Sequence, residues 1–398
     1  MKKVLNTCNF YMLLWCVFRL KGWLYQGDMI STISYALIML ISLYYFLISF
    51  NDYRYQPIIK SFNILVIFFT IYGGINILFF DDINKGWNVI PTDFFLQNIL
   101  RSILPFYAFY AFTKQGYITK KWICYAAIIV LLTCVPRYYI EQAKMLLIMQ
   151  GKGLFDVDEV TNNAGYLFSA VIPLFCFWKK KPIIQYAGFL ICTFFLLSCM
   201  KRGAILVGFV SLGFIFYHVF KSSGSKQKLI FFVLSLVLIY ISFEYFLYMA
   251  DNSAYFLQRL QETKEGNTSS RSVLYDEFWN MFWNNSNPFS LIFGLGADAT
   301  IRYGKNYAHN DWLEIAVDHG MVGVIIFTIF WSRIYNFLKR AKKYPVLYIA
   351  LGSCLLQLFA KTFFSMSIND MEFYTVLVLG YSTAIVTYPR LAEHQELT

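Results

Sequence analysis

A histidine at the start of an apolar run is the residue whose type and position best suit catalysis. The stretch "KNYAHNDWLEIAVDHGMVG" contains His309 directly ahead of Asn310 and Asp311, and the chain then becomes apolar. An imidazole, with an ordinary pKa near neutrality, can accept a proton from a reacting hydroxyl group. His309 is therefore a candidate general base. The alternative is a structural role, which a lone histidine takes more often.

The polar residues after His309 suit the first turn of a helix. Asp311 and Glu314 have the spacing of a capping box, in which the first side chain accepts from amides of the first turn and the second reaches back. Both carboxylates also suit the positive end of the helix dipole. We therefore expect a helix that begins at about Asp311, whereas Asp318 and His319 have no explanation from the sequence.

Three cations interrupt apolar sequence and could bind an anion. Lys201 and Arg202 form the turn of "LLSCMKRGAILVG", and Arg101 lies inside "LQNILRSILPF". An arginine deep in a membrane helix costs several kcal/mol unless it is paired or hydrated. We therefore expect Arg101 either to point into a crevice of a helical bundle or to form an ion pair with an acid such as Glu244.

These residues must be positioned by membrane helices. The 398 residues are 58% hydrophobic and 14% charged, and runs such as "LIFFVLSLVLIYISFEYFLYM" have no polar face, which argues against a soluble core. The sequence predicts an all-α, polytopic integral membrane protein with a single membrane domain over residues 1–398. We expect about twelve transmembrane helices, near residues 4–20, 31–50, 60–80, 94–112, 122–140, 162–178, 183–200, 203–220, 229–249, 310–332, 345–364 and 372–388.

The distribution of lysine and arginine predicts the orientation. If both termini are cytoplasmic, the short loops on that side are rich in Lys and Arg and poor in acids, as the positive-inside rule requires. The net charge of +11 is then a sign of topology and implies no nucleic-acid partner. The turn of Lys201 and Arg202 breaks this pattern on the outer side. Its cations either face an anionic ligand or reach outer headgroups.

One loop has room for a binding site. Residues 250–308 form a long outer, periplasmic loop, whereas the cytoplasmic loops have about five to thirteen residues and contain no Gly-rich phosphate loop. The segment "SSRSVLYDEFWNMFW", which starts near Arg271, has apolar residues at helical spacing. It predicts a helix that lies on the membrane surface or packs on the bundle.

The sequence offers no clear metal or disulfide site. The eight cysteines fall in or at the ends of spans, form no CxxC pair and are expected to be buried packing thiols. Asp156 and Asp158 in "FDVDEV" could hold a divalent cation through carboxylate oxygens. A metal-dependent site at these two residues is therefore kept as an alternative.

The motifs together resemble a known family. "HNDWLEIAVDHGMVG" is similar to the signature of the O-antigen ligase and polymerase superfamily of bacterial envelope polysaccharide enzymes. The "KRGA" turn resembles the basic turn of that family. "SSRSVLYDEFW" followed by "LIFGLGAD" resembles its long outer loop, with Arg271 at the expected position. The motifs cover roughly residues 160–330. The whole chain resembles the family in its expected arrangement of membrane spans.

The resemblance implies a metal-independent glycosyltransferase of the bacterial inner membrane that needs no cofactor. Its donor would be a glycan on undecaprenyl pyrophosphate, and its acceptor a lipid-linked repeat or the lipid A core. Arg202 and Arg271 would hold the pyrophosphate and His309 would activate or orient the acceptor. Lys201, Arg101 and Asn310 would bind substrate, and a chain-length regulator and a flippase are further candidate partners beside membrane lipids.

Polymerase and ligase remain alternatives within this family. We favour a polymerase of O-antigen, capsule or exopolysaccharide repeats, because a divergent chain with a compact loop suits the variety of polymerase acceptors. A ligase would transfer finished glycan to lipid A core. A transporter or flippase of lipid-linked glycan would also explain twelve spans, but it predicts repeated halves and basic residues along a pore, which the sequence lacks.

Overall fold

The fold is almost entirely helical. It was obtained as a computed structural model, which describes residues 6–25, 27–51, 56–84, 89–149, 162–199, 201–222, 224–252, 261, 264, 271–284, 287–304, 306–368, 371 and 373–393. The helices before residue 200 are α1 (Thr7–Arg19), α2 (Asp28–Ser49), α3 (Pro57–Phe79), α4 (Phe94–Ile103), α5 (Pro105–Lys114), α6 (Lys120–Met149), α7 (Ala164–Val171), the 3-10 helix η2 (Ile172–Trp178) and α8 (Pro182–Ser198).

The later helices include both long spans and short segments. They are α9 (Arg202–Ser222), α10 (Ser225–Asn252), α12 (Arg271–Trp283), α13 (Pro288–Phe293), α14 (Ala299–Tyr303), α15 (Asp311–Ala341), α16 (Pro345–Lys361), α17 (Phe373–Thr387) and α18 (Pro389–Glu393). The strands β1 (Ile83–Asn84) and β2 (Val89–Ile90) pair antiparallel, with Ile83 opposite Ile90 and Asn84 opposite Val89.

Several of these helices are suited to a bilayer. Among the described residues, five are long and apolar enough to cross it, over Asp28–Ser49, Pro57–Phe79, Lys120–Lys144, Arg202–Lys221 and Asp311–Ala341. Shorter apolar helices cover Ala164–Trp178, Pro182–Ser198, Pro345–Lys361 and Phe373–Thr387. The prediction of an all-α membrane protein is confirmed, whereas the count of twelve spans stays a prediction.

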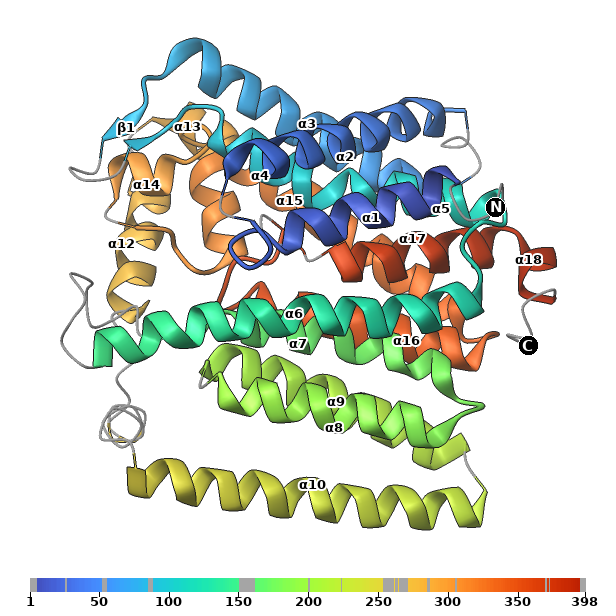
Figure 1. The fold of residues 1–398 in the computed structure, drawn as a ribbon. Coiled ribbons are helices and arrows are strands. Elements are labelled where there is room, and N and C mark those ends of the chain that lie inside the picture. Colours follow the sequence, from blue (N-terminus) through green and yellow to red (C-terminus); the bar gives the residue numbers. More distant parts are fainter. Residues whose placement is uncertain are drawn as a thin grey trace.

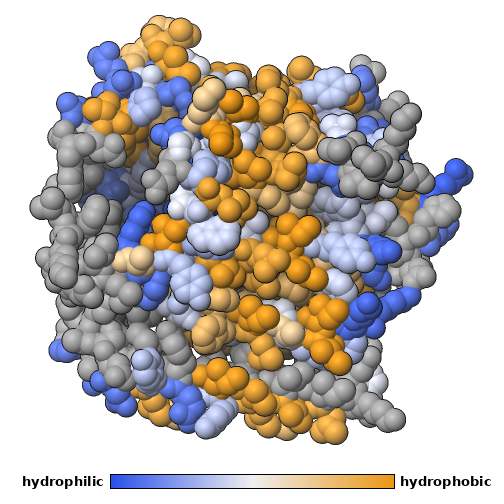
Figure 2. All heavy atoms as spheres, viewed as in Figure 1, coloured by the Kyte–Doolittle hydropathy of each residue, from blue (hydrophilic) through white to orange (hydrophobic). Residues whose placement is uncertain are grey.

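The long helices lie side by side along one direction. The start of α1 and helix α18 lie at one end of the bundle, and α12, α13 and α14 lie at the other end (Figure 1). Apolar side chains form a broad band across the middle of the visible face, and hydrophilic ones gather toward the two ends (Figure 2). This distribution is the one expected for helices that lie parallel to a membrane normal.

The centre of the bundle is the pair α5 and α17. Nearly every side chain of α17 is buried, and α17 packs closely along α5. Gly380 makes the close approach possible, because a Cβ at this position would lie 2.8 Å from Cβ of Phe109 and from the amide nitrogen of Tyr110. Small residues at such contacts strengthen helix packing in membranes, where the hydrophobic effect between helices is weak.

Helix α15 is broken where the outer segments meet it. Gly320 has φ of 63° and ψ of −164°, a conformation open almost only to glycine. A Cβ at Gly320 would overlap the Ile292 carbonyl, so the break also lets the backbone after α13 come into contact with α15.

The break frees carbonyl groups that the outer segment then uses. In an unbroken helix the carbonyls of Val317 and Asp318 would accept from amides four residues later. Next to the break they accept from the amides of Leu295 and Gly296, at 2.9 and 3.0 Å. The segment "FGLGAD" is thus hydrogen-bonded to the interior of a membrane helix.

Replacing Gly320 by alanine should destabilise the protein. The backbone conformation alone costs about 1–3 kcal/mol for a residue with a side chain, and the Ile292 carbonyl leaves no space for the new methyl group. Thermal unfolding in detergent measures the loss. The matched control is Gly213→Ala in α9, where nothing lies within 4 Å of the added Cβ. Equal unfolding temperatures for the two variants would contradict this account.

Candidate functional site

Three segments that are distant in sequence meet near His309. They are the start of α9 at Lys201, the start of α12 at Arg271, and the segment that precedes α15. Arg271 and Lys201 are both close enough to His309 for their positive charges to act on its imidazole. The structure thus brings together three of the residues singled out in the sequence.

Helix α12 is held against the bundle by apolar contacts. Phe278 and Phe282 are buried and pack with Ala308, Ala316 and Val317, which lie just before and within α15. Of the two alternatives for this amphipathic segment, packing on the bundle is the observed one. Arg271, at the first position of α12, is therefore held at a fixed distance from the start of α15.

A second contact joins α12 to the chain after α16. Tyr275, one turn after Arg271, donates its hydroxyl hydrogen to the carbonyl of Phe363 at 3.1 Å, and the His309 carbonyl lies 3.4 Å from the same hydroxyl. The side-chain amide of Asn310 also donates to the Phe363 carbonyl, at 3.3 Å. One backbone carbonyl thus holds both α12 and the segment that carries His309.

The backbone of His309 is left-handed, with φ of 52°. This conformation is uncommon for a residue with a side chain and costs about 1–2 kcal/mol. It persists because the neighbouring residues are held: the amide of Ala308 donates to the Glu314 carboxylate at 3.2 Å, and the amide of Asp311 donates to the Thr362 carbonyl at 2.9 Å. The backbone that carries the half-buried imidazole is therefore held in place on both sides of His309.

The predicted capping box is wrong. Asn310, not Asp311, caps α15, because its side-chain oxygen accepts from the amides of Trp312 and Leu313 at 3.0 and 3.2 Å. The carboxylate of Asp311 accepts instead from the amides of Ser367 and Ile368. Since the first-turn amides already have an acceptor, the acidic side chains are available to bond other segments.

Glu314 and Asp318 bond to the loop before His309. Glu314 accepts from the Thr300 hydroxyl at 2.9 Å. Asp318 accepts from the amides of Asp298 and Thr300, at 3.1 and 3.2 Å. Asp318, which the sequence did not explain, is therefore the acceptor for the start of α14.

His319 is the second residue that the sequence left without an explanation. Its ring is buried among Phe68, Phe69, Tyr72 and Phe95, with centroids 4.5–5.5 Å away. Within the part of the chain that the structure describes, neither ring nitrogen has a hydrogen-bond partner. His319 thus acts as an aromatic packing residue and lies apart from the contacts of His309.

The basic turn packs on the same segment that holds His309. A Cβ at Gly203, which follows Arg202, would overlap the Tyr166 hydroxyl and approach the Phe364 ring at 3.1 Å. Lys201 is half-buried, and Arg202, the first residue of α9, is exposed. The segment from Thr362 to Ile368 therefore contacts both the basic turn and the start of α15.

Arg101 lies in α4 and forms local contacts. It donates to the side chain of Asn98, one turn earlier, at 2.9 Å, and its charge acts on Tyr35. Glu244 is exposed on α10, and among the described residues no ion pair joins it to Arg101. The predicted alternative of an Arg101–Glu244 pair is therefore wrong. Within the described ranges, no polar contact joins Arg101 to His309, Arg271 or Lys201 either.

Burial and nearby cations keep His309 neutral. Burial lowers the pKa of His309 to about 4, with Arg271 and Lys201 adding to the effect, because each disfavours a charged imidazolium. At neutral pH the ring can therefore accept a proton or a hydrogen bond. Burial raises the pKa of Asp298 to about 6, against the opposing charge of Arg302. A neutral base beside cations suits the attack of a hydroxyl group on an anionic substrate.

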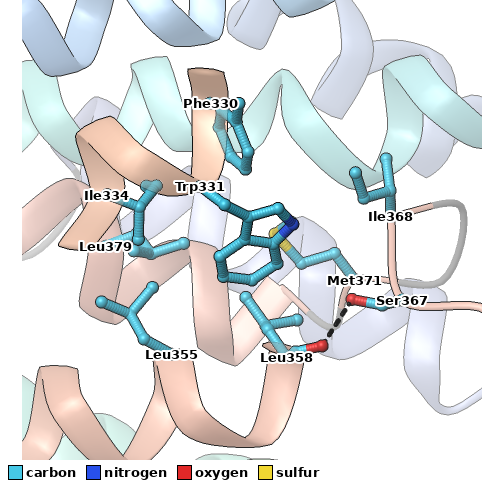
Figure 3. Close-up of a pocket in the computed structure, with 9 residues that line it drawn as sticks. All are labelled: Phe330, Trp331, Ile334, Leu355, Leu358, Ser367, Ile368, Met371 and Leu379. Atoms are coloured by element: carbon cyan, nitrogen blue, oxygen red, sulfur yellow. Dashed lines mark hydrogen bonds between the residues drawn. The ribbon is translucent and has the colours of Figure 1, made fainter. Parts of the chain in front are cut away.

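One small cavity near the His309 site cannot take part in this chemistry. A cavity of about 10 Å³ beneath the segment after α16 is lined mainly by apolar side chains, among them Trp331 and Leu358, and is too small for a substrate (Figure 3). Ser367 donates to the Leu358 carbonyl at its edge, at 3.0 Å.

The alternative metal ligands Asp156 and Asp158 lie outside the described residues.

Comparison with protein families agrees with the motif assignment. Residues 187–328 match a family model described as O-antigen ligase. This match confirms the predicted resemblance to the O-antigen ligase and polymerase superfamily. Lys201, Arg202, Arg271, His309 and Asn310 all lie within the matched range, whereas residue 101 lies outside it. No curated protein matches the chain.

Replacing Arg271 by glutamine should raise the pKa of His309 toward its ordinary value, because one of the two nearby cations is removed. His309 reacts with diethyl pyrocarbonate only when it is neutral, so its labelling should be lost at a higher pH in the variant. Mass spectrometry of the His309 peptide between about pH 4 and 7 measures this shift. Lys343→Gln, after the far end of α15, is the control. Identical profiles for wild type and Arg271→Gln would contradict the assigned contact.

Proposed function

We propose that this chain, with its match to the O-antigen ligase family, polymerises oligosaccharide repeats linked to undecaprenyl pyrophosphate on the periplasmic face of the bacterial inner membrane. One observation carries the proposal: a neutral histidine and two cations from three separate segments of the matched region lie together. Neutral His309 suits a hydroxyl acceptor, and Arg271 and Lys201 suit an anionic donor.

Arg202 and Arg271 would bind the donor pyrophosphate. A guanidinium group can bond two phosphate oxygens at once, which a lysine ammonium cannot do. Negative charge grows on the pyrophosphate as it leaves, so these cations would stabilise the transition state more than the bound substrate. Lys201 would add a third charge, since its ammonium group, like the Arg271 guanidinium, is close enough to lower the pKa of His309.

His309 would act on the acceptor. In the proposed step, an acceptor hydroxyl oxygen attacks the anomeric carbon of the donor glycan and forms the new glycosidic bond. The bond between that carbon and the pyrophosphate oxygen breaks, and undecaprenyl pyrophosphate leaves with the electron pair. The hydroxyl proton passes to the imidazole of His309, which is neutral before the step. No metal ion is needed in this scheme, because cationic side chains offset the developing charge.

The remaining predicted residues have supporting roles in the proposal. The side chain of Asn310 already bonds two amides of α15 and the Phe363 carbonyl. We therefore propose that Asn310 positions His309 and does not itself bind the glycan. Arg101 would line the groove for the lipid-linked donor, since it is only half-buried and, among the described residues, its hydrogen bond goes to Asn98 on its own helix.

The proposed topology has twelve spans, cytoplasmic termini and a periplasmic loop over residues 250–308. The positions of the start of α1 and of α18, opposite α12 to α14, support it (Figure 1). In this orientation His309 and Arg271 lie at the level of the outer headgroups, where the pyrophosphate of a membrane-embedded donor must also lie. A flippase would supply the donor to this face, and a chain-length regulator would act on the product.

An O-antigen ligase that transfers finished glycan to lipid A core is the second candidate. The description of the matched family favours it. Deleting the gene separates the two functions through the surface glycan that remains. Single-repeat products identify a polymerase, and polymer that stays on its lipid carrier identifies a ligase.

Alanine at His309, Arg202 or Arg271 should each abolish polymer formation while the protein still inserts into the membrane. Glycan ladders on gels from complemented deletion strains measure the effect, and immunoblots of membranes check insertion. Arg271→Lys should also fail, because the lysine ammonium group is a point charge and cannot bond two phosphate oxygens at once as a guanidinium can. Arg340→Ala, an exposed cation near the end of α15, is the control. Wild-type ladders from all three alanine variants would refute the proposal.

Activity of the purified protein in vesicles should survive excess EDTA, because side chains supply the positive charge at the leaving group. Polymer formed from lipid-linked repeats is the measured product. Protein-free vesicles give the background. Loss of activity with EDTA and its return with added Mg²⁺ would instead support the metal-dependent alternative.

A further inference from the structure

A cleft of about 530 Å³ lies between α9 and α10. Helix α9 has 21 residues and begins at the His309 site, and it is about 30 Å long. The cleft lies along the second half of α9, near the opposite end of the bundle. It is lined by Phe216, Tyr217, Phe220, Lys221, Lys228, Phe232 and Ser235.

The walls of the cleft are aromatic and open to the surroundings. Phe216 and Phe220 are one helical turn apart on α9, and Phe232 faces them from α10. The exposed fractions of Tyr217, Phe220 and Phe232 are 62%, 48% and 56%. Helix α9 is long and apolar enough to cross a bilayer, and residues 229–249 of α10 are a predicted span. Exposed aromatic side chains on such helices would meet hydrocarbon chains and not water.

Positive charge gathers at one end of the same cleft. Lys221 lies one turn after Tyr217, and Lys228 lies on the first turn of α10. The Lys228 ammonium group lies 5.4 Å from the centre of the Phe220 ring, so it is turned back over α9. Among the described residues that line the cleft, none is acidic. An aromatic channel that ends in two cations matches an amphiphile with an anionic head.

We infer that this cleft binds an anionic phospholipid from the leaflet opposite the His309 site. The phosphate would contact Lys221 and Lys228, and an acyl chain would lie against Phe216, Tyr217 and Phe232. The predicted orientation makes this the cytoplasmic leaflet. Helix α10 packs on α8 and α9, so a lipid in the cleft would add contacts that hold α10 to the bundle. The inference is independent of the proposed glycosyltransferase activity.

Native mass spectrometry of the purified full chain tests the inference. Phosphatidylglycerol and phosphatidylcholine with the same acyl chains are titrated into detergent solutions. The wild type should bind the first phosphatidylglycerol more tightly. The double variant Lys221→Gln, Lys228→Gln should bind it about twenty-five-fold more weakly, since each lysine near a membrane surface contributes about fivefold.

Two matched variants separate specific recognition from general charge. Lys179→Gln with Lys343→Gln removes two exposed lysines predicted to lie at the same membrane surface, outside the cleft, and should leave affinity unchanged. Lys221→Arg with Lys228→Arg keeps the charges and should keep the affinity. Equal binding of both lipids by the wild type would overturn the inference. So would equal losses in the cleft and control variants, or loss of binding in the arginine variant.

Discussion

The break of α15 at Gly320 is the constraint on which the rest of the outer face depends. A membrane helix must satisfy its backbone polar groups internally, so a break is tolerated only when other groups take over the freed bonds. Here the amides of Leu295 and Gly296 do so, and they thereby bring the segment after α13 onto α15. Once that segment is held, Asp318 and Glu314 can bond to the start of α14 and to Ala308. The position of His309 follows from these bonds.

The polar residues around His309 therefore divide into two groups with different tasks. Asn310, Asp311, Glu314 and Asp318 bond to amides or hydroxyls and determine where the backbone goes. His309 keeps an imidazole that burial and two cations hold in its neutral form. Among the described residues, none of these carboxylates bonds to the His309 side chain. Structural and chemical functions thus belong to neighbouring residues in one short stretch of sequence.

The sequence was sufficient for the all-α membrane class and for the start of α15. The structure places Arg271 and Lys201, both singled out from the sequence, close to His309. The sequence was insufficient for the partners of the acidic residues. Asp311 and Glu314 have the spacing of a capping box whether or not they cap, and the competing acceptor Asn310 changes their role. Asp318 bonds to residues about twenty positions earlier, which no local pattern reveals. The apolar face of α12 likewise fits a bilayer surface and a bundle equally well. For Tyr275, the one available signal was its spacing of one turn from Arg271.

At position 309, the left-handed backbone favours glycine, whereas the proposed chemistry requires an imidazole. Glycine would adopt this conformation without the strain, so the imidazole is placed at a local backbone cost of about 1–2 kcal/mol. Alanine would keep most of the strain and lose the same group. The histidine is therefore kept at a position whose backbone favours glycine. Its presence at such a position indicates a demand other than stability, and the side chain is retained at the expense of the fold.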